Sequence, residues 1–148
     1  MLRAILGVIV GYIVMVVLIV AGFTILQVAL GTEAVYKPAS WEPSVLFCVC
    51  AVVLGVAGAL VGGAVCRAIG RSATPVMVLA GLTLVFGLLS AALQMGKPDP
   101  GPRPAEVTAM DSAQNARSPM WLNLANPIIG ASGVMIGGGG LRKKKSAS

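Results

Sequence analysis

The sequence predicts an all-α fold: an integral membrane four-helix bundle, with a short helix on the outer surface between the third and fourth spans. Two observations carry this prediction. Of the 148 residues, 57% are hydrophobic and only 11% are charged, against about 45–50% and about 25% in soluble domains. Four long runs also contain no charged residue, so lipid is the expected solvent for most of the surface. The length allows a single membrane domain over residues 1–148.

The four uncharged runs lie at 4–32, 43–66, 72–96 and 118–141. Each is long enough for a helix to cross the hydrocarbon layer, which takes about 20 residues. Lipid offers no partners to backbone polar groups, so helices are the expected form, and no run alternates in polarity as a barrel strand would. The predicted spans cover about 4–30, 44–66, 75–95 and 120–140.

The first run follows Arg3, a short basic start that a secretory signal would also have. Its apolar stretch continues for more than twenty residues, whereas the core of a signal has about 7–15, and no A-x-A-like cleavage site closes it. The first run is therefore predicted to be a retained helix.

The second and third runs predict a tight pair of antiparallel helices. Pro43 suits the first helical position of the second run, because a backbone N–H at that position would have no hydrogen-bond acceptor within the helix. Gly70 is predicted to adopt the left-handed conformation that ends this helix. Only a few residues separate the two runs, so the two helices are expected to be neighbours.

The fourth run contains the stretch NPIIGASGVMIGGGGLRKKK, Asn126–Lys145, with one proline and six glycines. A helix that frays at Gly137 would still extend about 26 Å over Met120–Ile136, a slightly short span that local bilayer thinning can accommodate. The prediction is a complete crossing that ends at the basic tail. A re-entrant or interfacial segment is the alternative.

The loop at 97–118 begins with four prolines at alternate positions, which favour an extended, stiff backbone. Residues 105–117 then carry a weak apolar stripe at helical spacing, and Pro104 can start a helix. The prediction is a short helix on the outer surface of the bundle. A solvated, irregular loop is the alternative.

The positions of the cations predict the orientation, because cytoplasmic loops carry an excess of Lys and Arg. Short basic segments occur at Arg3, at Arg67 and Arg71, and in the tail 142–148. Four crossings place all three on the cytoplasmic side of a plasma membrane, and the layout resembles that of small bacterial inner-membrane proteins. The cations are not gathered on one face, so nucleic acid is not an expected partner. The predicted lipid head-group contacts are Arg142, Lys143, Lys144 and Lys145, at about 1 kcal/mol per cation.

Rows of small residues recur along the helices and predict close helix packing. The residues are Gly7 and Gly11 in the first run and Gly55, Ala59 and Gly63 in the second. Such rows allow two interpretations, which the sequence leaves open. They pack the four helices against one another, or they form an interface with a second copy or with a larger membrane protein.

A seam of polar and small residues follows one face of the fourth run, spaced 3, 4, 3 and 4 apart: Asn123, Asn126, Gly130, Gly133 and Gly137. Pro127 has no N–H and leaves the carbonyl of Asn123 without its helical partner. One interpretation is a polar notch that binds an ion or a head group. The other is hydrogen bonding to neighbouring helices together with close packing at the glycines.

Side chains for catalysis are scarce. The chain has no histidine, which removes the commonest general base and metal ligand, and no charged residue lies inside a run. Cys48 and Cys50 are the only enzyme candidates, and residues two apart on a helix are poorly placed for a disulfide. The sequence predicts no catalytic residue, no cofactor and no metal. The predicted function is a non-enzymatic membrane component that packs with itself or with a larger membrane partner. The alternative is a minimal channel or carrier for a neutral or lipidic solute.

Overall fold

The computed structural model of the chain describes residues 2–98, 100–104 and 115–139, and the regular elements within them are all helices. The all-α prediction is therefore confirmed for this part of the chain. The helices are α1 (Leu2–Val35), α2 (Val45–Gly70), α3 (Ala73–Met95) and α5 (Met120–Gly137).

Three helices are long and apolar enough to cross a membrane, over Leu2–Gly31, Val45–Gly70 and Ala73–Met95. The chain is a membrane protein on this ground. The predicted fourth span is helical only over Met120–Gly137, because the helix ends at the first of four consecutive glycines. Two asparagines and Pro127 also make α5 less apolar than the other three helices. The four-span bundle is thus supported for three helices, and the crossing by α5 stays a prediction.

Two predicted segments fall largely outside the described residues. The surface helix was expected over 105–117, of which only the last three residues are described, and the basic tail 142–148 lies wholly outside. Within the described parts of the long loop, Asn115 is helical, and residues 96–98, 100–104 and 116–119 are irregular.

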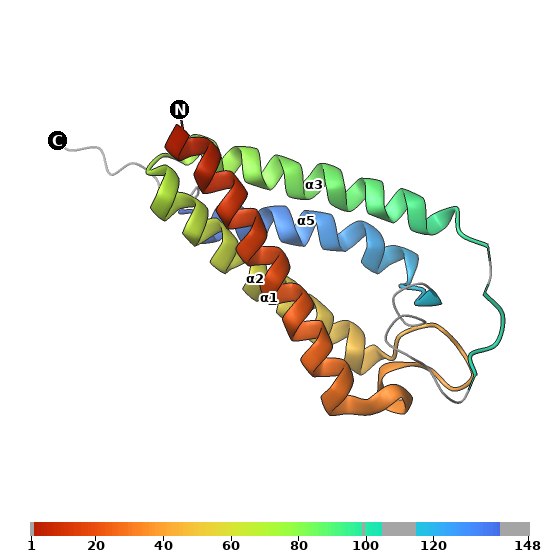
Figure 1. The fold of residues 1–148 in the computed structure, drawn as a ribbon. Coiled ribbons are helices and arrows are strands. Elements are labelled where there is room, and N and C mark those ends of the chain that lie inside the picture. The colour runs from red at the N-terminus through yellow and green to blue at the C-terminus, as the bar shows by residue number, and fades with distance from the viewer. Residues whose placement is uncertain (1, 99, 105–114, 140–148) are drawn as a thin grey trace.

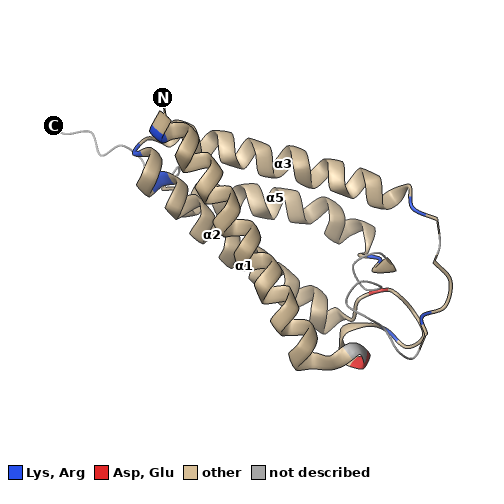
Figure 2. Ribbon diagram, in the orientation of Figure 1, with Lys and Arg blue, Asp and Glu red and all other residues tan. Residues whose placement is uncertain are grey.

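Charged residues gather at the two ends of the bundle (Figure 2). We call one the basic end: it carries Arg3, Arg67 and Arg71 and, among the described residues, no acidic side chain. The other is the loop end, formed by the last turn of α1 and by segments 36–44, 96–98, 100–104 and 115–119, where acids and cations are mixed. The stretches of helix between the two ends carry no charged residue, as a bilayer requires.

The first turn of α2 is fixed by Ser44 and not by Pro43. The hydroxyl of Ser44 accepts a hydrogen bond from the Phe47 amide (3.2 Å) and donates one to the Ala34 carbonyl (2.5 Å). Ser44 is therefore the N-cap, and Pro43 precedes it instead of occupying the first helical position. This cap also ties the start of α2 to the end of α1.

At its other end α2 stops with Arg71 in the left-handed conformation (φ 54°), and Gly70 is still helical. The prediction of Gly70 as the left-handed residue was wrong. Gly70 serves close packing: a Cβ there would lie 2.8 Å from Pro75 Cγ, and the backbone of Gly70 lies against Gly7.

The helices form two pairs, α1 with α2 and α3 with α5, and α5 contacts α2 about as extensively as it contacts α3. Figure 1 shows the two pairs close together at the basic end and diverging toward the loop end. Their inner faces meet in a core in the basic half of the bundle, made of Met15, Ala59, Cys66, Val76, Leu79, Ala80 and Val134. The loop half is less closely filled.

The loop end is held together by Arg103, which is 9% exposed. Its backbone amide donates to the Ala39 carbonyl (3.3 Å), and its guanidinium lies over the ring of Tyr36 (5.6 Å) and 3.2 Å from Glu33. These contacts fix segment 100–104 against the connection between α1 and α2. A cation over an aromatic face is stabilised by the ring quadrupole.

Candidate functional site

The small residues of α1 bring its backbone against α2. A Cβ on Gly7 would lie 2.9 Å from the Cys66 carbonyl oxygen, and one on Gly11 would lie 2.8 Å from the Gly62 carbonyl oxygen. No side chain fits into such spaces. The pair Gly7 and Gly11 therefore packs α1 on α2 within one chain.

The inner half of the polar seam packs in the same way on α2. A Cβ on Gly63 would collide with the backbone of Val134, and one on Gly137 would collide with the backbone of Leu60. A Cβ on Gly133 would lie 2.8 Å from the Cβ of Ala59. At these contacts, in the basic half of the bundle, α5 lies directly against α2.

Gly55 behaves differently from the other small residues of α2. A Cβ on Gly55 would meet nothing within 4 Å, and this glycine lines a cavity of about 310 Å³ between the two helix pairs. We call this space the central cavity. At about 30 Å³ per water molecule, its volume equals that of roughly ten waters and reaches the lower end of the range for small-molecule sites, about 300–1,000 Å³.

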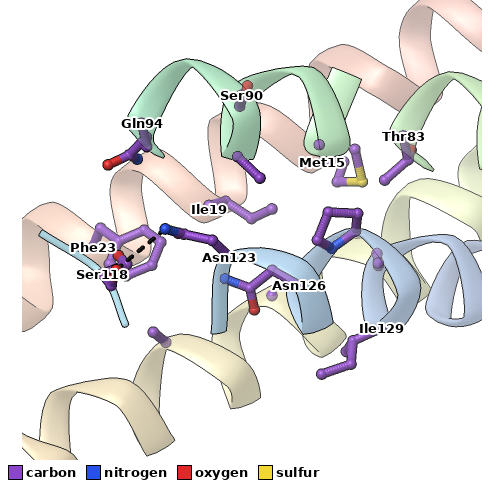
Figure 3. A pocket seen from close by; sticks show the side chains of 17 residues that line it. Met15, Ile19, Phe23, Thr83, Ser90, Gln94, Ser118, Asn123, Asn126 and Ile129 are labelled. Atoms are coloured by element: carbon purple, nitrogen blue, oxygen red, sulfur yellow. Dashed lines mark hydrogen bonds between the residues drawn. The ribbon is translucent and has the colours of Figure 1, made fainter. Parts of the chain in front are cut away.

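All four described helices contribute to the wall of the central cavity, on their loop-end halves (Figure 3). The floor, toward the core, is formed by Met15 of α1 and Ala59 of α2. The polar side chains on the wall are Thr83, Ser90 and Gln94 of α3, Ser118, and Asn123 and Asn126 of α5. Polar groups thus face an apolar floor.

Two of these polar side chains are already engaged. Thr83 donates its hydroxyl to the Leu79 carbonyl of its own helix (2.9 Å), and Asn123 donates its side-chain amide to the Ser118 carbonyl (3.2 Å). The side chains of Gln94 and Asn126 make no hydrogen bond with the rest of the described chain. Their amides each offer donors and an acceptor to a molecule in the cavity.

Pro127 shapes the wall beside them. Its ring packs on Gly87 of α3, where a Cβ would lie 2.7 Å from Pro127 Cγ. Inside a helix a proline leaves the carbonyl four residues earlier without its usual donor, which here is the carbonyl of Asn123. Pro127 therefore sets the spacing of α3 and α5 and leaves a further acceptor on α5, next to the cavity.

None of the described residues that line the central cavity is charged at neutral pH. An ionised group transferred from water into such a site would lose its hydration and gain no counter-charge. The wall is consequently suited to uncharged molecules.

The predicted seam is thus divided between two roles. Asn123, Asn126 and Gly130 line the central cavity, whereas Gly133 and Gly137 lie against α2. The sequence did not predict that Phe23, Thr83, Ser90 and Gln94 would join them. Ser90 and Gln94 are polar residues within an apolar run, which is a signal, but nothing in the run shows which helix they face.

The cysteines do not form a group with the cavity. Cys48, Cys50 and Cys66 are all free, and Cys48 and Cys66 are buried. No group of three His, Cys, Asp or Glu side chains in the described ranges is placed to hold a metal ion.

Comparison of the chain with protein-family models, with curated proteins and with solved structures finds no match. Function is therefore inferred from the geometry of the central cavity and from the three helices that can cross a membrane.

Proposed function

We propose that the chain crosses the membrane four times, with the basic end and both termini on the cytoplasmic side. The cations of the basic end support this orientation, because Lys and Arg concentrate in cytoplasmic segments. The 18 residues of α5 rise about 27 Å, close to the ~30 Å of the hydrocarbon layer. The lower hydropathy of α5 is compatible with a membrane crossing, because its asparagines face the central cavity instead of lipid.

In this orientation the protein binds a neutral, amphipathic or lipidic solute in the outer half of the membrane. The single observation that carries this function is the central cavity, which has unpaired amides at Gln94 and Asn126, an apolar floor and no charged residue in its described wall.

The packing at the basic end favours a pocket over a pore. The core at Met15, Ala59 and Val134, and the contacts of Gly63 and Gly137 with backbone, lie between the central cavity and the basic end. A solute that enters from the loop end meets a closed floor. A carrier function would need a second conformation in which the two helix pairs separate at the basic end.

The other predicted function, a component that packs with itself or with a larger membrane partner, stays a prediction. Its motivation was the rows of small residues. Gly7, Gly11, Ala59 and Gly63 are used within the chain and Gly55 lines the cavity, so these rows provide less support for an external interface than for the bundle.

The binding of decanol to the purified protein in phosphatidylcholine nanodiscs tests the proposed function, with native mass spectrometry as the readout. The informative substitution is Gly55→Leu, because Gly55 lines the cavity and a Cβ at this position would meet nothing within 4 Å, so the leucine side chain starts in open space. We expect a loss of affinity of at least tenfold.

The matched control is Gly81→Leu on α3. Gly81 also has nothing within 4 Å of its Cβ position, it is exposed, and it does not line the central cavity. We expect unchanged binding in this variant. Equal affinity of Gly55→Leu and the unsubstituted protein, or no binding of decanol at all, would refute the assignment of the cavity.

A further inference from the structure

A second space adjoins the central cavity at the loop end. It measures about 520 Å³ and is lined by residues of α1, α2 and α3 and of the segments before α2 and α5. We call it the vestibule. Its wall includes Thr24, Gln27, Tyr36, Phe47 and Ala116, none of which lines the central cavity.

The two spaces share three wall residues, Phe23, Gln94 and Ser118. These residues form a neck between them; Figure 3 shows the three on the same side of the central cavity. The ring of Phe23 also contacts that of Phe47 in the vestibule (5.7 Å between centroids). From Met15 at the floor to Gln27 in the vestibule, α1 rises about 18 Å, which is roughly the thickness of one leaflet.

The vestibule has a different chemistry from the central cavity. Three aromatic rings, those of Phe23, Tyr36 and Phe47, lie beside the neutral amides of Gln27 and Gln94. No described residue of its wall carries a formal charge at neutral pH. Cations flank the vestibule but are not part of its described wall. Arg103 lies over the Tyr36 ring and pairs with Glu33. Lys37, next to Tyr36 in the chain, pairs with Glu42, and Arg117, between Ala116 and Ser118, donates a hydrogen bond to the Pro98 carbonyl.

We infer that the two spaces form one binding site for a single-chain amphipath with an uncharged, hydroxyl-bearing headgroup. The apolar chain occupies the central cavity and the headgroup occupies the vestibule. Aromatic rings pack against the C–H faces of such a headgroup, and the amides bond to its hydroxyls. This inference rests on the proposed function and adds the headgroup class to it.

Three probes with the same ten-carbon chain test the inference: decanol, decyl glucoside and decyl sulfate, each below its micellar concentration. Binding to the full chain in nanodiscs is followed by native mass spectrometry. We expect decyl glucoside to bind at least tenfold more tightly than decyl sulfate, because the wall offers hydrogen bonds and no counter-charge.

Two substitutions separate the two spaces. Ala116→Trp adds a large side chain to the vestibule wall and is expected to lower the affinity for decyl glucoside at least tenfold while the affinity for decanol is unchanged. Gly55→Leu takes up part of the central cavity and is expected to lower the affinity for both probes. If Ala116→Trp also lowers the affinity for decanol, Gln27→Leu is the second test. The inference requires Gln27→Leu to lower the affinity for decyl glucoside and to leave the affinity for decanol unchanged.

The outcomes distinguish the inference from the function on which it rests. The inference is overturned if decanol binds but neither Ala116→Trp nor Gln27→Leu changes the affinity for decyl glucoside. The proposed function is unaffected by that result. Equal affinity for decyl sulfate and decyl glucoside also overturns the inference. Failure of all three probes to bind overturns the proposed function as well.

Discussion

At the scale of single residues, the glycines of this bundle serve different purposes that their identity alone does not reveal. Gly63 lies where a Cβ would collide with the backbone of Val134, whereas Gly55 and Gly81 have no neighbour within 4 Å of the same position. Close approach of backbones drives helix association in lipid. Gly63 is therefore structural, while Gly55 leaves open the space in which a ligand can lie.

Gly63→Ala should lower the stability of the bundle. The added methyl group forces α2 and α5 apart, and overpacking of this kind costs about 1–3 kcal/mol. Unfolding by SDS in mixed micelles, followed by circular dichroism, measures the change.

Gly81→Ala is the control for that measurement. Its methyl group meets nothing, and alanine is the better helix former, so stability should be unchanged or slightly higher. A Gly63→Ala protein as stable as the Gly81→Ala protein would show that α2 and α5 do not meet as described.

At the scale of elements, the two helix starts that follow serines differ in what the serine does. Ser44 caps α2 with its side chain and also bonds to the end of α1. Ser72 occupies the same position before α3 but makes no side-chain capping bond. The α1–α2 connection is thus fixed by side-chain hydrogen bonds, whereas the α2–α3 turn depends on the left-handed Arg71.

Ser44→Ala should destabilise the protein by about 0.5–2 kcal/mol, the range for loss of an N-cap. Ser72→Ala should change stability by less than about 0.5 kcal/mol, as surface substitutions commonly do. Thermal unfolding in nanodiscs compares the two variants, and equal destabilisation would contradict the capping role of Ser44.

At the scale of the whole molecule, the divergence of two helix pairs creates the space to which we assign function. The pairs meet over the core at the basic end and separate toward the loop end (Figure 1). This shape places a closed floor toward the basic end of the bundle and the neutral cavities toward the loop end.

The number of crossings is open to direct test. Single cysteines at Arg71, Lys97 and Ser146, in a chain whose three native cysteines are replaced by alanine, are treated with a membrane-impermeant maleimide in intact cells. Four crossings predict labelling at position 97 alone. Labelling at 97 and 146 together would mean that α5 does not cross.

The sequence by itself determined the solvent and the class of fold. Long uncharged runs cannot face water, and in lipid their backbones must form helices, so α1, α2 and α3 follow from composition and length. The sequence also predicted the seam of α5, because its polar and small residues recur at spacings of three and four, and residues so spaced share a helix face.

Only the tertiary structure decided what that seam does. Asn123 and Asn126 face a cavity because α3 and α5 diverge from α1 and α2 at their level, while Gly133 and Gly137 meet α2 where the pairs converge. Helix period places residues on a face but carries no information on how far away the facing helix lies. That distance depends on which small residues of neighbouring helices meet, and so on contacts between segments far apart in the chain.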